Sequence, residues 1–391
     1  MTNHRKINIL DTLIILDMYC VLFMLIFTIL QWELIVSFFF LVTFAISLCL
    51  FLVRCLLLEK KDVYFGLSIV IIVLAIINVL LTNQGELSFE YFKKIIIFSC
   101  SIQYIEVTRI IQPKYSIIRS YKTVILVSGL VFVVCYYVLN IRTIYKTSNL
   151  LSMNFTNPNL LGMWLLLIFL SLIACSLKSK NRKYNYTAYL CCVLLIPIMI
   201  KCDARNTVFP LLFSIALSFF INNNNRLKIL TIFSMWFPII FVIIYLNFID
   251  TIMNIGFLKF LVSEGKALDS RYYIWKNLVS ILNNNLFLGN YYLISGGTGV
   301  SQCLNTHLDI LCSYGVFVYV MTVALLTNKY LKIGESISQF SIKERIVYAI
   351  CVSVTLIGVG EAAIFSGGIG IYIFTFIPTI LIDCEDEVGY F

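Results

Sequence analysis

The chain has 391 residues, of which 60% are hydrophobic and 13% are charged, and its mean hydropathy is +0.94. A soluble domain usually carries about a quarter charged residues, so this composition excludes a soluble protein and indicates an integral membrane protein. The net charge of +9 does not require a nucleic-acid partner, since membrane proteins collect Lys and Arg on their cytoplasmic side.

The apolar stretches are long enough for membrane-spanning helices, which need about 20 residues each, whereas barrel strands would be shorter and alternate in polarity. We therefore predict an all-α polytopic membrane protein in which residues 1–391 form one integral membrane domain. About twelve spans are expected, at approximately 10–30, 34–53, 64–82, 95–111, 122–140, 159–177, 186–201, 207–221, 229–248, 305–327, 345–360 and 368–382.

The first expected span is interpreted as a retained helix and not as a signal peptide. Arg5 and Lys6 precede it, its apolar run is too long for a signal-peptide core, and no small-residue cleavage site follows. The fourth is the weakest, because polar residues including Glu106 interrupt it. We interpret Asp17 in the first span and Glu106 in the fourth as structural or interfacial groups.

The distribution of positive charge predicts the orientation of the chain in the membrane. Most of the 29 Lys and Arg residues fall in segments that are cytoplasmic if the N-terminus is cytoplasmic, as the known charge bias of membrane proteins requires. The clearest marker is "KSKNRK" at 178–183, which we interpret as a topology signal. An even number of spans then places the C-terminus in the cytoplasm as well.

One loop on the extracytoplasmic side is longer than any cytoplasmic loop. Residues 249–304 separate the ninth and tenth expected spans, and "SRYYIWKNLVSILNN" within them has apolar residues, including Trp275, at helical spacing. This spacing predicts an amphipathic helix, and "LFLGN" and "SGGTG" mark a turn and a flexible stretch after it. Because functional residues gather on loops held by a rigid scaffold, we expect the functional site on this side.

Several motifs of cofactor and nucleotide chemistry are missing from the sequence. It contains no P-loop, no GxGxxG, no HExxH and no His, Asp and Glu cluster with metal-ligand spacing. We therefore expect no cofactor, no metal ion and no ATP-driven transport by this chain alone. An enzyme of this kind would take an already activated substrate from the lipid phase.

Three short stretches, "KCDARNT", "SRYYIW" and "NTHLDIL", place polar residues at the predicted outer ends of helices. These residues are Lys201, Asp203, Arg205, Arg271, Asn305, His307 and Asp309. Ionisable groups at membrane depth are costly and usually face a cavity or a partner. Two arginines converging on one outer cavity would suit a pyrophosphate, because Arg keeps its charge and binds phosphate oxygens through paired hydrogen bonds.

Each of these residues also has a purely structural interpretation. Arg205 would pair with Asp203 at the membrane interface, and Arg271 would solvate a surface helix. His307 would bond a nearby carbonyl at the helix start, and Asp309 would cap or pair with that helix.

Four stretches, in this order along the chain, resemble the O-antigen polymerase and ligase superfamily, which includes the capsular and exopolysaccharide repeat-unit polymerases. "NFTNPNLLGMWLLL" is similar to an Asn-x-Asn-x-x-Gly stretch that opens a span in that family, with matches at Asn157, Asn159 and Gly162. "DARNTVFPLL" resembles a Ser-Arg-small stretch. Its Arg205 matches, whereas Ala and Asn replace the family's Ser and Gly on either side.

The other two stretches lie in and after the predicted large loop. "SRYYIWKNLVSILNNNLFLG" is similar to an Arg-x-x-x-Trp segment that ends in a phenylalanine–glycine turn, with matches at Arg271, Trp275 and Gly289, although the usual Pro is missing. "LNTHLDILCSYG" resembles a His-Asn-x-x-Leu stretch followed by a Gly, with matches that include Asn305 and Gly315.

The family's His is absent from its usual position, where this chain has Leu304. His307 follows three residues later, and residues three apart on a helix share a face. His307 would then present its imidazole to nearly the same cavity. Alternatively, the role of the family's His is absent here and His307 is only a helix-end residue.

The resemblance implies a metal-independent polymerase that joins undecaprenyl-pyrophosphate-linked oligosaccharide repeat units outside a bacterial cytoplasmic membrane. Arg205 and Arg271 would offset the charge of the leaving pyrophosphate. His307, or Asp309 as a second candidate base, would act on the acceptor hydroxyl. The candidate substrate-binding residues are Asn157, Asn159, Lys201, Trp275 and Asn305.

The expected partners are the lipid-linked glycan donor and acceptor, the lipid bilayer and a chain-length regulator protein. Two other functions compete with the polymerase. A ligase of the same superfamily would pass the glycan to a different acceptor, and a flippase would move lipid-linked units across the membrane without chemistry. The long outer loop with Arg271 argues against a flippase, whose charged residues are expected near the midplane.

Overall fold

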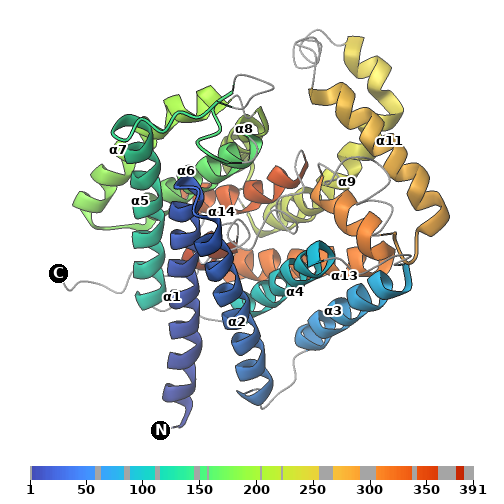
Figure 1. Cartoon of the computed structure of the whole chain (residues 1–391), viewed down its shortest axis with the longest axis horizontal. Helices are drawn as coiled ribbons and strands as arrows, with labels where there is room; N and C mark the ends of the chain where they lie inside the picture. Colours follow the sequence, from blue (N-terminus) through green and yellow to red (C-terminus); the bar gives the residue numbers. More distant parts are fainter. Residues whose placement is uncertain are drawn as a thin grey trace.

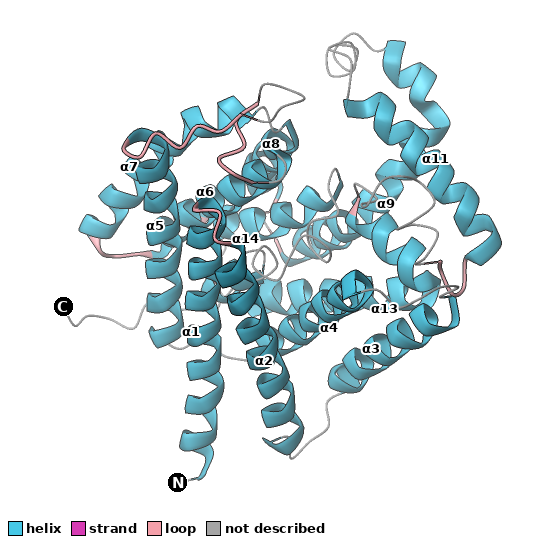
Figure 2. Ribbon diagram, viewed as in Figure 1, coloured by secondary structure: helices cyan, strands magenta, loops and turns pink. Residues whose placement is uncertain are grey.

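A computed structural model describes the chain over residues 2–57, 63–82, 89–110, 115–144, 150–155, 158–202, 205–221, 223–254, 267–290, 305–336, 341–359 and 376–382. Within these ranges the regular structure is helical, apart from one isolated antiparallel bridge between Ile144 and Leu151 (Figure 2).

The described residues form twelve α-helices and two short 3-10 helices (Figure 1). In chain order they are α1 Thr2–Ile29, α2 Glu33–Leu57, α3 Val63–Thr82, α4 Phe89–Ile110, α5 Tyr115–Tyr137, α6 Pro158–Lys178, α7 Arg182–Cys202, α8 Arg205–Phe220, α9 Asn224–Asn254, α11 Ala267–Asn285, α13 Thr306–Ser336, α14 Ile342–Thr355, η1 Leu356–Val359 and η2 Ile377–Leu381.

Helix α6 forms the centre of the bundle. Its successive residues Leu165, Leu166, Leu167 and Ile168 are all at most 1% exposed. Four successive helical residues point in all directions, so α6 is covered on every side, as expected for a helix that is apolar all round. Its neighbours are α5, α7, α8 and α14, while α1 packs on α2 and α5, and α13 packs on α3 and α9.

Eight of the described helices are long and apolar enough to cross a membrane, and they are α1, α2, α3, α5, α6, α7, α9 and α13. Together with the composition, they make the chain a polytopic all-α membrane protein. Helices α8 and α14 are shorter, with 16 and 14 residues. Exposed apolar side chains such as Leu48 and Leu52 of α2 suit contact with lipid.

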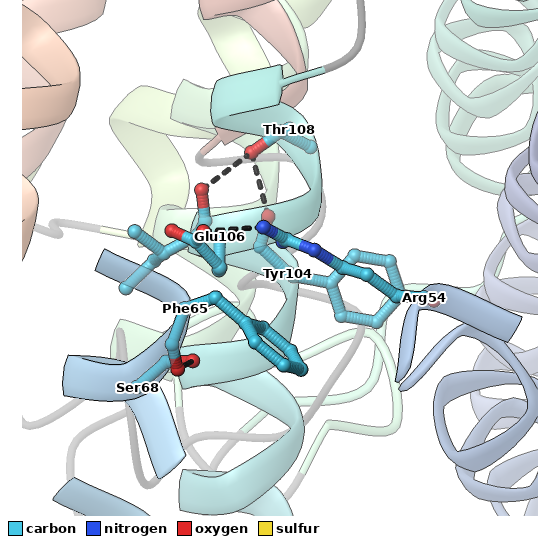
Figure 3. Close-up of polar contacts among 7 residues, drawn as sticks. Arg54, Phe65, Ser68, Tyr104, Glu106 and Thr108 are labelled. Carbon is cyan, nitrogen blue, oxygen red and sulfur yellow. Dashed lines mark hydrogen bonds and ion pairs between the residues drawn. The ribbon is translucent and has the colours of Figure 1, made fainter. Parts of the chain in front are cut away.

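Helix α4 carries polar side chains into the bundle interior, which explains why its segment is the weakest span of the sequence. Nη2 of Arg54, on α2, lies 2.6 Å from Oε1 of Glu106, on α4, and both side chains are at most 7% exposed. Figure 3 shows the Arg54 guanidinium reaching Glu106 across the ring of Phe65, whose centroid is 4.8 Å away. The ion pair and the aromatic ring together stabilise a buried cation.

Two further polar contacts tie α4 to its neighbours. Nζ of Lys329, on α13, donates to the Thr108 hydroxyl and lies 4.7 Å from the centroid of the Phe376 ring. The Tyr104 hydroxyl donates to the Asp17 carboxylate on α1. Asp17 and Glu106 therefore have partners inside the bundle, as their structural interpretation expects.

Replacing Glu106 with Gln tests the buried ion pair. The change removes the carboxylate that neutralises the Arg54 guanidinium, and breaking a buried pair costs about 3–5 kcal/mol. We expect a clear fall in the thermal unfolding midpoint of the purified chain in detergent. Glu335→Gln is the matched control, because the Lys228–Glu335 pair is 47% and 55% exposed and should contribute less than about 1 kcal/mol. Equal effects of the two variants would contradict the expectation.

Candidate functional site

The candidate site is the start of α13, where Asn305 holds two elements together. Its Oδ1 accepts a hydrogen bond from the backbone N–H of Leu308 at 2.9 Å, and its Nδ2 donates to the Pro238 carbonyl at 3.2 Å. The first contact is an N-terminal cap, which satisfies one of the N–H groups that a helix start leaves without partners. Pro238 lies near the middle of the candidate span Asn224–Phe248, so the start of α13 lies beside the middle of α9.

His307 is buried in the first turn of α13 and is bonded to a side chain. Its Nδ1 lies 3.2 Å from the hydroxyl of Tyr319, and the two rings meet edge to face. The Tyr319 ring in turn meets Trp236 of α9 edge to face, with centroids 5.9 Å apart. The structure therefore gives His307 a phenolic hydroxyl as a partner at Nδ1, where the structural interpretation expected a backbone carbonyl.

The contact between His307 and Tyr319 requires a break in α13. The two residues are twelve positions apart, so a straight helix would separate their Cα atoms by about 18 Å, more than the two side chains span together. Gly315 lies between them with φ +84° and ψ 172°, which is not helical. The break folds the first arm of α13 back toward the second arm and brings the two side chains together.

The turn after α11 replaces the hydrogen bond that this break removes. In an unbroken helix the Val316 N–H would donate to the Cys312 carbonyl. Instead, Val316 donates to the Leu286 carbonyl at 3.0 Å, and the Cys312 carbonyl accepts from the Asn290 N–H at 2.7 Å. The backbone N–H and carbonyl groups of the turn and of the break therefore supply hydrogen bonds to each other. This matters because unpaired backbone groups inside a membrane are costly.

Two glycines make this close approach possible. A Cβ on Gly289, which has φ +70°, would lie 2.7 Å from the Cys312 carbonyl oxygen and from the Gly315 nitrogen. A Cβ on Gly315 would collide with the carbonyl oxygen of Phe287. Gly289 and Gly315 are two of the three glycines that match the family resemblance, they come from separate stretches, and the structure places them in contact.

Asn78 of α3 also supports the break, and the sequence analysis missed it. Its Nδ2 donates to the Tyr314 carbonyl at 2.5 Å, and the Tyr314 ring stacks on Phe98 of α4 with centroids 4.4 Å apart. The available signal was the one amide side chain in the largely apolar run 63–82, where the other polar side chains are hydroxyls. A polar side chain in such a run is expensive unless it has a specific partner.

Asp309 and Trp275 occupy different surroundings near the same helix start. Asp309 lies in the first turn of α13, where a carboxylate interacts favourably with the helix dipole. It is two positions from His307, and residues two apart on a helix do not face each other. Trp275 of α11 is 1% exposed and packs edge to face on Tyr245 and Phe241 of α9, so its indole ring belongs to the core between these helices.

The remaining predicted site residues are distributed over other helices. Lys201 is exposed at the end of α7, with its Nζ 5.6 Å from the centroid of the Tyr136 ring. Asn159 is half-buried in the first turn of α6. Asn157 lies outside the described residues. Arg205 begins α8 and Arg271 lies in the first half of α11, but neither side chain is among those described.

The structure thus brings together Asn305, His307 and Asp309 at one helix start with Trp275 in the adjoining core. Among the described residues, no group of three or more His, Cys, Asp or Glu side chains is arranged to hold a metal ion. Comparisons of the chain with protein families, with curated proteins and with solved structures found no match.

Gly315→Ala tests the broken helix. Alanine is strained at this backbone conformation by about 1–3 kcal/mol, and its Cβ would push the turn after α11 away. We expect a lower thermal unfolding midpoint in detergent. Gly66→Ala is the matched control, since a Cβ there meets nothing within 4 Å and alanine favours a helix interior by about 0.5–1 kcal/mol. Equal midpoints for the two variants would refute the role of the break.

Proposed function

We propose that the chain belongs to the O-antigen polymerase and ligase superfamily and polymerises undecaprenyl-pyrophosphate-linked oligosaccharide repeat units. The observation that carries the proposal is the contact between Gly289 and Gly315. These glycines come from the two stretches in and after the large loop that resemble the family. Their reciprocal contact gives both stretches one structural role, which is to hold the turn after α11 against the break in α13.

The proposal includes a topology. Twelve spans cross a bacterial cytoplasmic membrane, both termini are cytoplasmic, and residues 249–304 form the extracytoplasmic loop. The positive charge of the sequence supports this orientation. This orientation places Arg54, near the end of α2, and Lys329, near the end of α13, toward the cytoplasm. The start of α13 is then the end of that helix nearer the outer face, set into the membrane beside the middle of α9.

The proposed reaction is a transfer at the anomeric carbon of the donor. The acceptor hydroxyl oxygen forms a bond to that carbon, the bond from the carbon to the pyrophosphate oxygen breaks, and undecaprenyl pyrophosphate leaves with the electron pair. The imidazole of His307, or the carboxylate of Asp309, takes the hydroxyl proton. Arg205 and Arg271 offset the negative charge that builds on the leaving group. Direct displacement of this kind inverts the anomeric configuration.

The other candidate residues divide into two roles in this proposal. Asn305 and Trp275 are buried and engaged with α9, so the role proposed for them is to position the helix start. Asn157, Asn159 and Lys201 remain candidates for contact with the glycan. The proposed partners are the two lipid-linked glycans, the bilayer and a chain-length regulator.

The first test is complementation of cells that lack the gene. Surface glycan and lipid-linked intermediates are extracted from the null strain and from strains restored with wild type, Arg271→Ala or Lys276→Ala. Lys276 is an exposed cation on the same helix and serves as the matched control. We expect single repeat units on the outer face in the null strain, and a polymer ladder with wild type and Lys276→Ala but not with Arg271→Ala.

Other results of this experiment separate the competing functions. Single units held on the cytoplasmic face of the null strain would identify a flippase. Complete polymer that fails to reach its final acceptor would identify a ligase. Either result refutes the polymerase proposal.

His307→Gln tests the proposed base. Glutamine can still hydrogen-bond the Tyr319 hydroxyl but cannot accept a proton near neutral pH. Loss of a general base costs about 10²–10⁴-fold in rate, so we expect that loss in polymerisation by purified chain with a lipid-linked repeat unit. The unfolding midpoint should stay near that of wild type. An unchanged rate would remove His307 from the chemistry, and Asp309→Asn is then the variant to measure.

A further inference from the structure

The turn after α11 exposes a group of apolar side chains at a defined place. Leu286, Phe287 and Leu288 are 43%, 62% and 43% exposed, and Phe317, on the second arm of α13, is 57% exposed. The rings of Phe287 and Phe317 lie 5.8 Å apart. The exposed part of this turn is therefore an apolar tip that continues the apolar surface of α13.

Backbone hydrogen bonds fix the depth of this tip relative to α3. The Leu286 carbonyl and the Asn290 N–H bond the two sides of the α13 break, and the Tyr314 carbonyl within that break accepts from Asn78 of α3. Figure 1 shows the end of α11 beside α3 and α13. The tip is thus tied to α3 at about the level of Asn78.

Helix α3 serves as a depth scale because it is an uninterrupted candidate span, Val63–Thr82, of 20 residues. At about 1.5 Å per residue it matches a hydrocarbon thickness of about 30 Å. Asn78 lies about one helical turn before its end, so the tip lies about 6 Å inside that end. Leu80 and Leu81, which follow Asn78, are also large exposed apolar residues.

We propose that Leu286, Phe287 and Leu288, together with Phe317, insert among the acyl chains of the membrane and anchor α11 there. The partner of this surface is lipid. Non-helical backbone is tolerated at such depth only where protein satisfies it, and the break in α13 does so for Leu286 and Asn290. The proposal depends on the membrane character of the chain and not on the glycan chemistry proposed above.

The consequence concerns the loop that links α9 to α13. Its helix α11 is fixed at one end by the lipid-inserted tip and along its length by the packing of Trp275 on α9. The helix that carries Arg271 is then held at the membrane surface and not suspended in the aqueous phase. A lipid-borne substrate would meet an apolar surface directly beside the break in α13.

Spin-label accessibility tests the proposal on the full chain in phosphatidylcholine vesicles. The variant Phe287→Cys is built in a chain whose native cysteines are replaced by Ser or Ala, and labelled with a nitroxide. Collision rates with molecular oxygen, which concentrates among acyl chains, and with a water-soluble nickel chelate are compared. Val73→Cys, on the exposed face within α3, is the lipid control, and Lys180→Cys, in an exposed polar loop, is the aqueous control.

We expect the oxygen-to-nickel ratio at Phe287→Cys to be close to that at Val73→Cys and well above that at Lys180→Cys. A ratio like that of Lys180→Cys would place the tip in water and overturn the proposal. Low collision rates with both reagents would show that protein, such as a second copy of this chain, covers the tip, and would overturn it too. If the chain without native cysteines does not fold, quenching of Phe287→Trp by brominated acyl chains, relative to the parent chain, decides the same question.

Discussion

The arrangement around the candidate site depends on one backbone feature, the break in α13 at Gly315. A broken helix leaves carbonyl and amide groups without their usual partners, and inside a membrane each such group is costly. The turn after α11 and the side chain of Asn78 supply those partners. Because these groups are satisfied by two separate segments, the break also fixes α3 and α11 relative to α13. The contact of His307 with Tyr319 then follows, since only a folded α13 brings these residues within reach.

The same need for satisfied polar groups explains the position of α4. Glu106 and Thr108 lie two positions apart and so point to different sides of α4, and the helix packs where Arg54 meets the first and Lys329 meets the second. A buried ion pair contributes little net stability compared with apolar packing of the same volume. The ion pair nevertheless joins α2 to α4, which are separated in the sequence by α3. The pair therefore favours one arrangement of these helices over arrangements that leave either charge unpaired.

Much of the fold was predictable because a membrane-spanning helix needs about 20 consecutive apolar residues, and such runs are visible in the sequence. The expected span at 159–177 corresponds to α6, Pro158–Lys178, and the interrupted fourth span corresponds to the polar α4. The bend of α13 was not predictable, because an isolated Gly in an apolar run is also tolerated in a straight helix. Asn78 was missed for a related reason, since its partner is the Tyr314 carbonyl, and a sequence does not show which backbone groups tertiary structure leaves free. The sequence identified the start of α13, but not its contact with the middle of α9.

The position of His307 shows where helical spacing stops being a guide to which residues share a face. The sequence suggests that His307 replaces a His expected at Leu304, because residues three apart share a helical face. That relation holds only between residues of one helix, and Asn305 is the cap at which α13 begins. Leu304 lies outside the described residues. The case for His307 therefore depends on its own surroundings, in which a phenolic hydroxyl bonds one ring nitrogen and Trp236 packs behind that phenol. Such a pair holds the imidazole in one orientation, as a general base requires, and a structural histidine bonded to a phenol is held in the same way.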